Sequence, residues 1–329
     1  MTTQYGNVND TSGYSQAFKS AYKTGYEHVL QEVKDVYAGY TRVDTIEGEK
    51  KAYDFMGTIE LTEKTTRFGD VPINETDHNR RWLAPRWFRK GIYIDDLDKI
   101  ALMADPTSDY IQALAKGAIR VKNDVVFAAF EGDVSGGKDW AVTTADVFSF
   151  NDAVPTAASM WASEGGRTIP HDSTKGAQVG GTSAGLTIDK LILAREGLTQ
   201  LKNDPNSIFN FVCSPRQLSD LLREAETQSI DTNVIRSLVS GQIKEYMGFR
   251  FVVDYNVVIG SSNDIDADTN IYPCYAFTND ALLVAQHTAP MFTVDWIPQK
   301  QIWQVFGQIG VCAGRMDEDK VIKVECAAV

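Results

Sequence analysis

Residues 46–94 constrain the fold of this chain more than any other segment. They are rich in threonine, charged residues and turn-forming residues, and their apolar runs are short. This composition predicts a long, mostly extended two-way ribbon instead of a compact unit. A two-stranded ribbon alone is only marginally stable in water, and residues 1–94 contain little apolar surface that could close on itself. We therefore expect this leading part of the chain to need another chain to lie on.

The charge balance and the lack of targeting signals limit the possible partners. The 329 residues include 32 Lys and Arg against 44 Asp and Glu, which gives a net charge of −12. A sequence-reading nucleic-acid binder needs clustered basic residues for its phosphate contacts. No stretch reaches the ~18 uncharged apolar residues of a membrane span, and the start MTTQYGNVND has no secretory pattern. We expect a soluble, intracellularly made protein with no membrane partner.

The sequence predicts no metal site and no cofactor. None of the four histidines pairs with another His or with a Cys at ligand spacing, and the four cysteines fit neither a zinc clamp nor a disulfide framework. An acidic loop contains Asp264, Asp266 and Asp268 at alternate positions, as a calcium loop does. Thr269 and Tyr275, however, replace the glycine and the glutamate of an EF-hand. A casual divalent-ion contact at this loop stays open.

Helical periodicity predicts amphipathic helices over residues 15–40 and 108–131, where apolar residues recur at steps of three and four. Thr107 or Ser108 can cap the second helix, and Gly132 can end it. Shorter helices are expected in DDLDKIALMADP, over 187–201 and in QLSDLLREAE.

Alternation of apolar and polar residues predicts strands in SIFNFVCSP, RFVVDYNVV, CYAFTNDALLVA and QIWQVFGQIGVCA. The last of these places Trp303, Val305, Ile309 and Val311 on one face. After the turn MDEDK, the segment VIKVECA is expected to pair with it as a hairpin. Because helices and strands mix without regular alternation, the pattern indicates an α+β fold.

Two short motifs resemble nucleotide-binding and catalytic loops. Residues 132–138 match the first seven positions of a phosphate-binding loop, but Asp139 replaces the required hydroxyl, and the segment follows a helix instead of opening one. The sequence GTSAG at 181–185 matches the elbow of serine hydrolases, with Asp254 and His287 in the required order. The preceding KGAQVGG cannot form the buried strand that such an elbow needs. We favour a Gly/Ser loop, with a hydrolase using Ser183 as the minor alternative.

The strongest charge feature is the stretch RRWLAPRWFRK, which has no acidic residue and interleaves basic with aromatic side chains. This pattern can bind single-stranded nucleic acid, but Arg and Trp are also preferred anchors of buried protein contacts. The net negative charge opposes nucleic-acid affinity, and Asp95, Asp96 and Asp98 supply a complementary surface. We therefore favour an interface between copies of the chain. Its candidate residues are Arg80, Arg81, Trp82, Arg86, Trp87, Arg89 and Lys90.

The order of several segments resembles the major capsid proteins of tailed bacteriophages. The front half of that family is similar to TGYEHVLQEVKD, IEGEKKAYDFMG, the basic stretch and IDDLDKIALMADPTSDYIQALAKGAIRVKNDVVFAAFEG. The back half is similar to TIDKLILAREGL, FNFVCSPRQLSDLL, LVSGQIKEYMGFRFVV and GVCAGRMDEDKVIKVEC. The resemblance covers nearly the whole chain from about Tyr26. Its specificity comes from the order and spacing of many segments and not from one motif.

The resemblance implies the α+β coat fold named after phage Hong Kong 97. Residues 1–45 would form an N-terminal arm, and 46–94 an extended loop that lies across a neighbouring subunit. Residues 95–204 together with 289–329 would form a peripheral domain, with the long helix as its spine, and 205–288 an axial domain at capsomer centres. Some relatives have a helical scaffolding region before the arm, whereas only about 14 residues stand there in this chain. The resemblance thus implies a separate scaffolding protein, if there is one.

The resemblance also implies a structural function and not an enzymatic one. The chain would assemble with itself as hexamers and pentamers into the icosahedral shell of a phage head, around non-specifically held double-stranded DNA. The shell would assemble in the cytoplasm of a bacterial host. Its partners would include a portal protein and, in some heads, a cement protein. The alternatives of another class are an encapsulin-like nanocompartment shell, the serine hydrolase, and a single-strand binder that uses the basic stretch.

Overall fold

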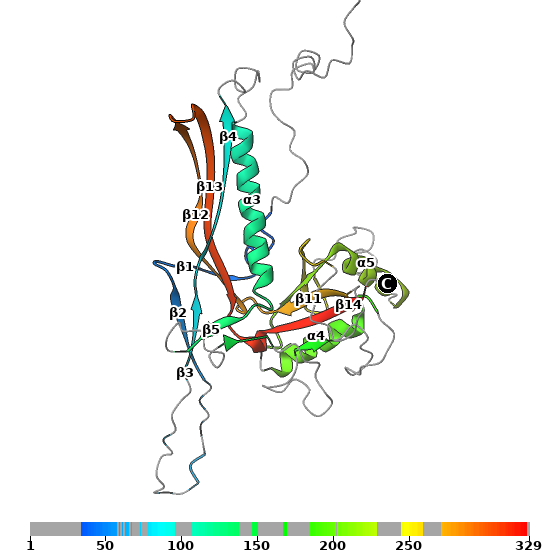
Figure 1. The fold of residues 1–329 in the computed structure, drawn as a ribbon. Helices are drawn as coiled ribbons and strands as arrows, with labels where there is room; N and C mark the ends of the chain where they lie inside the picture. Colours follow the sequence, from blue (N-terminus) through cyan, green and yellow to red (C-terminus); the bar gives the residue numbers. More distant parts are fainter. Residues whose placement is uncertain are drawn as a thin grey trace, which may run out of the picture. The chain divides into compact units, whose positions relative to one another are not determined.

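A computed structural model describes most of the chain from residue 34 to residue 327 (Figure 1). The described residues are 34–57, 59, 61, 63–65, 67, 73, 78–95, 107–137, 147–150, 167–169, 184–201, 203–228, 245–258 and 271–327. They fall into two compact units. The smaller unit lies within Met1–Lys34, Trp87–Val121 and Thr288–Gly310, and the larger within Asp35–Arg86, Lys122–His287 and Val311–Val329. None of the described helices is long and apolar enough to cross a membrane.

In the smaller unit, a long helix lies along a sheet (Figure 1). Helix α3 spans Thr107–Ala128, which confirms the predicted long helix to within three residues of its predicted end. This unit contains β4 from Trp87 onward, residues 288–297 of β12 and residues 302–310 of β13. Strand β1 belongs to the larger unit, and the strand order of the sheet is β1-β12-β13-β4. A Cβ on Gly307 would lie 3.5 Å from Leu114 of α3 and 3.0 Å from the Phe292 ring, so the missing side chain lets the helix approach. The strands are β1 (Arg42–Thr45), β4 (Arg86–Asp95), β12 (Leu282–Ile297) and β13 (Ile302–Arg315).

In the larger unit, the root of the predicted ribbon is a strand pair. Strands β2 (Lys51–Met56) and β3 (His78–Leu83) are antiparallel, with Lys51 opposite Leu83 and Met56 opposite His78. Two short strands, β5 (Val134–Gly136) and β6 (Val147–Phe148), complete a sheet of order β2-β3-β5-β6. The ribbon prediction is confirmed for β2 and β3. It is wrong for β4, which belongs to the sheet with β13.

The larger unit also contains a six-stranded mixed sheet of order β7-β14-β11-β8-β10-β9. Helices α4 (Ile188–Gln200) and α5 (Pro215–Gln228) contact it and each other, and both were predicted from the sequence. Every residue of β8 and of β14 is buried, so the sheet is covered on both faces. The strands are β7 (Thr168–Ile169), β8 (Phe209–Cys213), β9 (Glu245–Tyr246), β10 (Phe249–Val253), β11 (Ile271–Phe277) and β14 (Val321–Ala327).

The predicted C-terminal hairpin is wrong. Strand β14 pairs with β11 and β7, whereas β13 lies between β12 and β4 in another sheet. The connection is the short 3-10 helix η2 (Glu318–Lys320), which Asp317 caps by accepting from the Asp319 amide. Lysine and glutamate are almost never fully buried unless they are paired. Lys323 is fully buried and pairs with Glu131 at 3.1 Å.

Two further expectations need correction. CYAFTNDALLVA is two strands, β11 and β12, because the chain turns where Ala281 donates to the Thr278 carbonyl. Most of the predicted helix 15–40 lies outside the described residues, but residues 36–40 form a turn. The predicted short helix DDLDKIALMADP also lies outside them, except for its first residue, Asp95, which ends β4. Tyr37 fixes that turn: it is buried, packs near Phe130 and donates its hydroxyl to Asp254.

Candidate functional site

The basic stretch is divided between two strands of different sheets. Arg80, Arg81 and Trp82 belong to β3, and Arg86, Trp87, Arg89 and Lys90 belong to β4. Ala84 and Pro85 separate the strands. The stretch therefore does not form one continuous surface element, and each half is described in its own sheet.

On β3, Arg80 and Trp82 make contacts within the ribbon root. Arg80 forms an exposed bidentate ion pair with Asp54, its partner across β2. Trp82 is half-buried and donates its indole N–H to the Gly137 carbonyl at 3.0 Å. The Arg80 guanidinium carbon lies 5.6 Å from the centre of the Trp82 ring, within cation–π range. These contacts hold β3 between β2 and β5.

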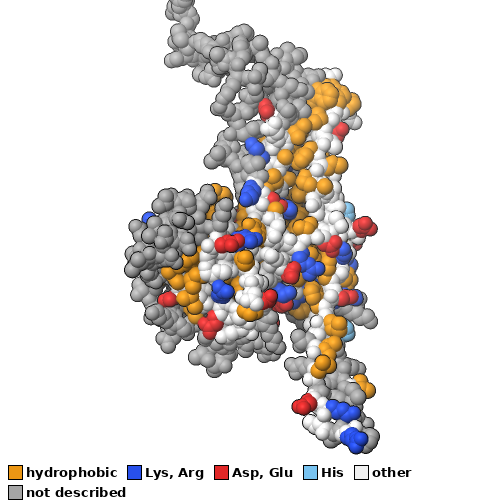
Figure 2. Space-filling model, turned by 180° about the vertical axis from the view of Figure 1, so that it is seen from behind, with side chains coloured by type: hydrophobic (Ala, Val, Ile, Leu, Met, Phe, Trp, Pro, Cys, Tyr) orange, Lys and Arg blue, Asp and Glu red, His pale blue; other side chains and the backbone are white. Residues whose placement is uncertain are grey.

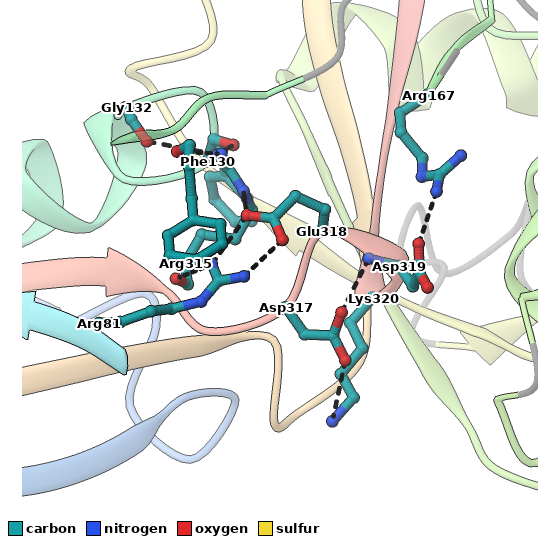
Figure 3. Close-up of polar contacts among 10 residues, drawn as sticks. Arg81, Phe130, Gly132, Arg167, Arg315, Asp317, Glu318, Asp319 and Lys320 are labelled. Atoms are coloured by element: carbon teal, nitrogen blue, oxygen red, sulfur yellow. Dashed lines mark hydrogen bonds and ion pairs between the residues drawn. The ribbon is translucent and has the colours of Figure 1, made fainter. Parts of the chain in front are cut away.

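Arg81 is buried and is bound by its own chain (Figure 3). Its Nη1 donates to Oε1 of Glu318 at 2.7 Å and to the Arg315 carbonyl at 2.9 Å, while Nη2 donates to Oε2 of Glu318. The Phe148 ring covers the guanidinium, with 4.2 Å between the guanidinium carbon and the ring centre. An arginine held in this way cannot also reach a neighbouring subunit. The structure therefore places Arg81 apart from the other basic residues.

A second buried arginine shares Glu318. Arg315 is fully buried and donates to the carbonyls of Phe130 at 2.7 Å and Phe148 at 3.3 Å, and to Glu318 at 3.4 Å. Burial lowers the pKa of Arg315. Burial would raise the pKa of Glu318, but hydrogen bonding and the charges of the two arginines outweigh it and hold that pKa below its usual value. We call Arg81, Arg315 and Glu318 the arginine node.

The half of the stretch on β4 faces solvent. Arg86, Arg89 and Lys90 are exposed, and Trp87 is 45% exposed. Among the residues that the structure describes, neither Arg89 nor Lys90 has an acidic partner. Strand β4 is the last strand of its sheet, and side chains alternate along it, so positive charge projects on both faces of an edge strand. We call Arg86–Lys90 the basic strand.

The described residues between β2 and β3 carry exposed apolar side chains. Ile59 is 65%, Leu61 95% and Ile73 94% exposed. In Figure 2, hydrophobic side chains lie at the surface of this extended loop beside basic and acidic ones. An apolar group of this kind on a projecting segment is typical of a contact surface.

The root of the extended loop is packed on a small core. Leu83 of β3 and Val134 of β5 contact Leu283, Ala285, Cys312 and Met316 from strands β12 and β13 and the residue that follows. A Cβ on Gly314 would lie only 2.4 Å from a methyl group of Leu83. The root is thus fixed by close packing as well as by the arginine node.

Sequence reasoning missed the arginine node because Glu318 lies 237 positions from Arg81. It also missed Lys190, which is fully buried on α4 and donates to the carbonyls of Ala184, Gly185 and Glu325. The one available signal for Lys190 was a charged residue on the apolar face of a predicted helix.

The structure gives part of the phosphate-loop match another role. Residues 134–136 of the phosphate-loop match form strand β5, with Ser135 opposite Trp82 and Val147, while Lys138 lies outside the described residues. Ser183 lies outside them as well. Asp254 accepts hydrogen bonds from the Tyr37 hydroxyl and the Asn256 amide, and burial raises its pKa.

No metal-binding group is found where the structure describes the chain. No cluster of three or more His, Cys, Asp or Glu within the described ranges could hold an ion. Asp264, Asp266 and Asp268 lie outside those ranges. The four cysteines are free and buried, and burial raises the pKa of Cys312 to about 11.

Comparisons with known proteins agree with this architecture. Solved structures with the same fold include the capsid of cyanophage P-SCSP1u (TM-score 0.67, 13% identity, 100% of this chain and 99% of that chain). The capsid of cyanophage Pam1 has a TM-score of 0.66 at 13% identity, covering 99% of both chains. The capsid of Ralstonia phage GP4 has a TM-score of 0.64 at 12% identity, covering 100% of this chain and 98% of that one.

The curated proteins contain no match to this chain. The family model described as phage capsid protein matches residues 14–328, and neither the nanocompartment shell nor the hydrolase is favoured by these comparisons. By this match over nearly its whole length, the chain belongs to the phage capsid protein family.

Proposed function

We propose that this chain is the major capsid subunit that forms, as hexamers and pentamers, the icosahedral shell of a phage head around double-stranded DNA. The chain is a structural capsid protein of the virion shell. We propose that the chain acts by associating with other copies of itself and not as an enzyme. The observation that carries the proposal is the extended loop, whose exposed Ile59, Leu61 and Ile73 have no apolar cover among the described residues of this chain.

The proposed parts follow the order of the chain. Residues 1–45 serve as the arm and 46–94 as the extended loop that lies across a neighbouring subunit. Residues 95–204 with 289–329 form the peripheral domain around α3, and 205–288 form the axial domain. A separate scaffolding protein, a portal protein and, where the head has one, a cement protein are the further partners. Packaged DNA is enclosed without sequence reading by an inner surface that tolerates DNA and does not bind it tightly, which the net charge of −12 allows.

The neighbouring copy can cover the extended loop with an apolar sheet face. Gly91 of β4 faces Gln304 and Phe306 of β13, on the side of the sheet opposite to Leu114 of α3. By alternation, Trp87 and Tyr93 share that side of β4. Tyr93 is 57% exposed. We propose this face as the surface on which the loop of a second copy lies.

The interface proposed from the basic stretch is carried by the basic strand, with Arg80 and Trp82 at the loop root. Subunits with a net charge of −12 repel each other, so exposed cations at the contact favour association. We expect the double substitution Arg89→Gln and Lys90→Gln to raise the critical concentration for assembly about tenfold at low salt, through modest contacts repeated around each capsomer. The dependence of assembly on sodium chloride should also weaken. Light scattering at several salt concentrations measures both effects.

The matched control is Arg250→Gln. Arg250 is a partly exposed arginine of β10 that pairs with Glu245 at 3.0 Å in its own chain. Its loss should leave the critical concentration unchanged. Assembly of the double variant at the parent's concentration and salt dependence would contradict the proposed interface.

A further inference from the structure

We propose that Glu318 is a positioning residue that sets the direction of the extended loop by holding two buried arginines together. The inference rests on the proposed function and goes beyond it. It assigns to the connection between β13 and β14 a role in the geometry of a loop more than 200 positions earlier in the chain.

Each residue of the arginine node lies on a different element of the fold and connects that element to the other two. Arg81 belongs to β3, the central strand of the ribbon root, where it lies opposite Tyr53 of β2 and Gly136 of β5. Arg315 ends β13 and binds the Phe130 and Gly132 carbonyls that follow α3. Glu318 lies in η2 and accepts from both arginines (Figure 3). One carboxylate therefore connects the loop root to the end of the long helix and to the chain leaving β13.

The contacts of Arg81 fix the orientation of β3 relative to η2 and also attach β3 to it. Arg81 meets Glu318 through two parallel hydrogen bonds, and such a bidentate pair fixes the plane of the guanidinium. The Phe148 ring lies against that plane, and the centre of the Phe55 ring of β2 lies 5.7 Å from the guanidinium carbon. Rotation of β3 relative to η2 would break the two bonds and the ring contact together. A lysine at this position would keep the charge but lose the fork and the stacking.

Glu318 is the residue of the arginine node whose charge balances both buried arginines. The side chains of Arg81 and Arg315 are 7% and 0% exposed, and the Glu318 side chain is 25% exposed. Without the carboxylate, two buried positive charges would face each other with little screening. Their other acceptors, the carbonyls of Arg315, Phe130 and Phe148, would remain. We therefore expect Glu318→Gln to loosen the loop root without unfolding the subunit.

The test measures the direction of the loop root in dissociated full-length subunits. Met56→Cys at the end of β2 and Ile208→Cys before β8 are exposed sites in the same unit, and all four native cysteines are buried. Nitroxide labels on these two cysteines give a distance distribution by pulsed electron paramagnetic resonance. The parent should give one narrow distribution. Glu318→Gln should widen it by about twofold, because the supporting contacts of the root are lost.

Two comparisons separate positioning from general stability. Arg81→Lys keeps a buried positive charge and should also widen the distribution. Asp54→Asn breaks the exposed ion pair with Arg80 on the same ribbon and should leave it narrow. A parent-like distribution in Glu318→Gln or in Arg81→Lys would overturn the inference. Loss of folding in both variants would overturn it too, since the node would then serve folding and not direction.

The same protein samples distinguish a failure of the proposed capsid function from a failure of the role proposed for Glu318. If the parent does not form particles, the proposed function fails, while the distance distributions still decide the role of Glu318. If the parent assembles and Glu318→Gln has a widened distribution, its yield of closed particles should fall about tenfold, because each misdirected loop affects a repeated contact. Full assembly of that variant would overturn the link from loop direction to the shell.

Discussion

Replacing Ile59, Leu61 and Ile73 together by serine should abolish particle formation and leave the dissociated subunit as stable as the parent. These side chains are 65%, 95% and 94% exposed, so their removal costs the subunit little core packing. Covering such a side chain by a neighbour contributes about 1.5–3 kcal/mol. The loss recurs at every subunit contact of a closed shell, and weak contacts that act together fail together. Negative-stain microscopy and chemical denaturation measure the two parts of this expectation.

The matched control keeps the apolar character of the loop. Ile59→Val, Leu61→Ile and Ile73→Val change shape slightly while leaving hydrocarbon at each position, and this triple variant should still assemble. Normal particles from the serine variant would show that the exposed loop residues are not part of the contact.

The largest loss of subunit stability should come from Lys190→Met. The Lys190 ammonium donates to the carbonyl oxygens of Ala184 at 2.7 Å, Gly185 at 3.0 Å and Glu325 at 3.0 Å, and the side chain is fully buried. Methionine fills a similar volume but leaves the half-buried Gly185 carbonyl and the buried Glu325 carbonyl without this donor, at about 1–3 kcal/mol for an unsatisfied buried group, whereas the Ala184 carbonyl still accepts from the Ala327 amide. Relief of burying a charge offsets part of the cost. We expect a net loss of about 3 kcal/mol in the free energy of unfolding.

Urea denaturation of dissociated subunits measures this loss. Lys300→Met is the matched control, because Lys300 is exposed and lies over the Tyr93 ring at 5.0 Å. Its substitution should change the free energy of unfolding by about 1 kcal/mol or less. Equal stability of the two variants would mean that the three carbonyl contacts contribute nothing measurable.

Elements with a strong local pattern were predictable from the sequence. The period of α3 is set by residues three and four apart, and the bounds predicted for α4, 187–201, agree with the observed Ile188–Gln200 to within one residue at each end. The face of β13 that carries Val305 and Ile309 was predictable from the alternation of apolar and polar residues along the strand. The loop root was predicted because a segment without long apolar runs cannot form a core by itself.

What failed depended on partners distant in sequence. Lys323 and Glu325 of β14 are both buried, and Lys323 pairs with Glu325 and with the distant Glu131. Strand β14 pairs with β11 and β7, which lie far from it in the sequence, so neighbouring turns could not predict the pairing. Arg81 was assigned to an interface between copies of the chain, with the rest of the basic stretch, for the same reason. A local pattern does not reveal whether a distant acid such as Glu318 will meet an arginine.

Hydrogen exchange of the full-length protein before and after assembly tests the central claim most directly. The claim is that the extended loop is covered by a neighbouring copy. The amides of Ile59, Leu61 and Ile73 should exchange rapidly in dissociated subunits and slowly in closed particles, while those of β8 stay slow in both. Slow exchange of the loop amides already in the dissociated subunit, or rapid exchange in the particle, would contradict the claim.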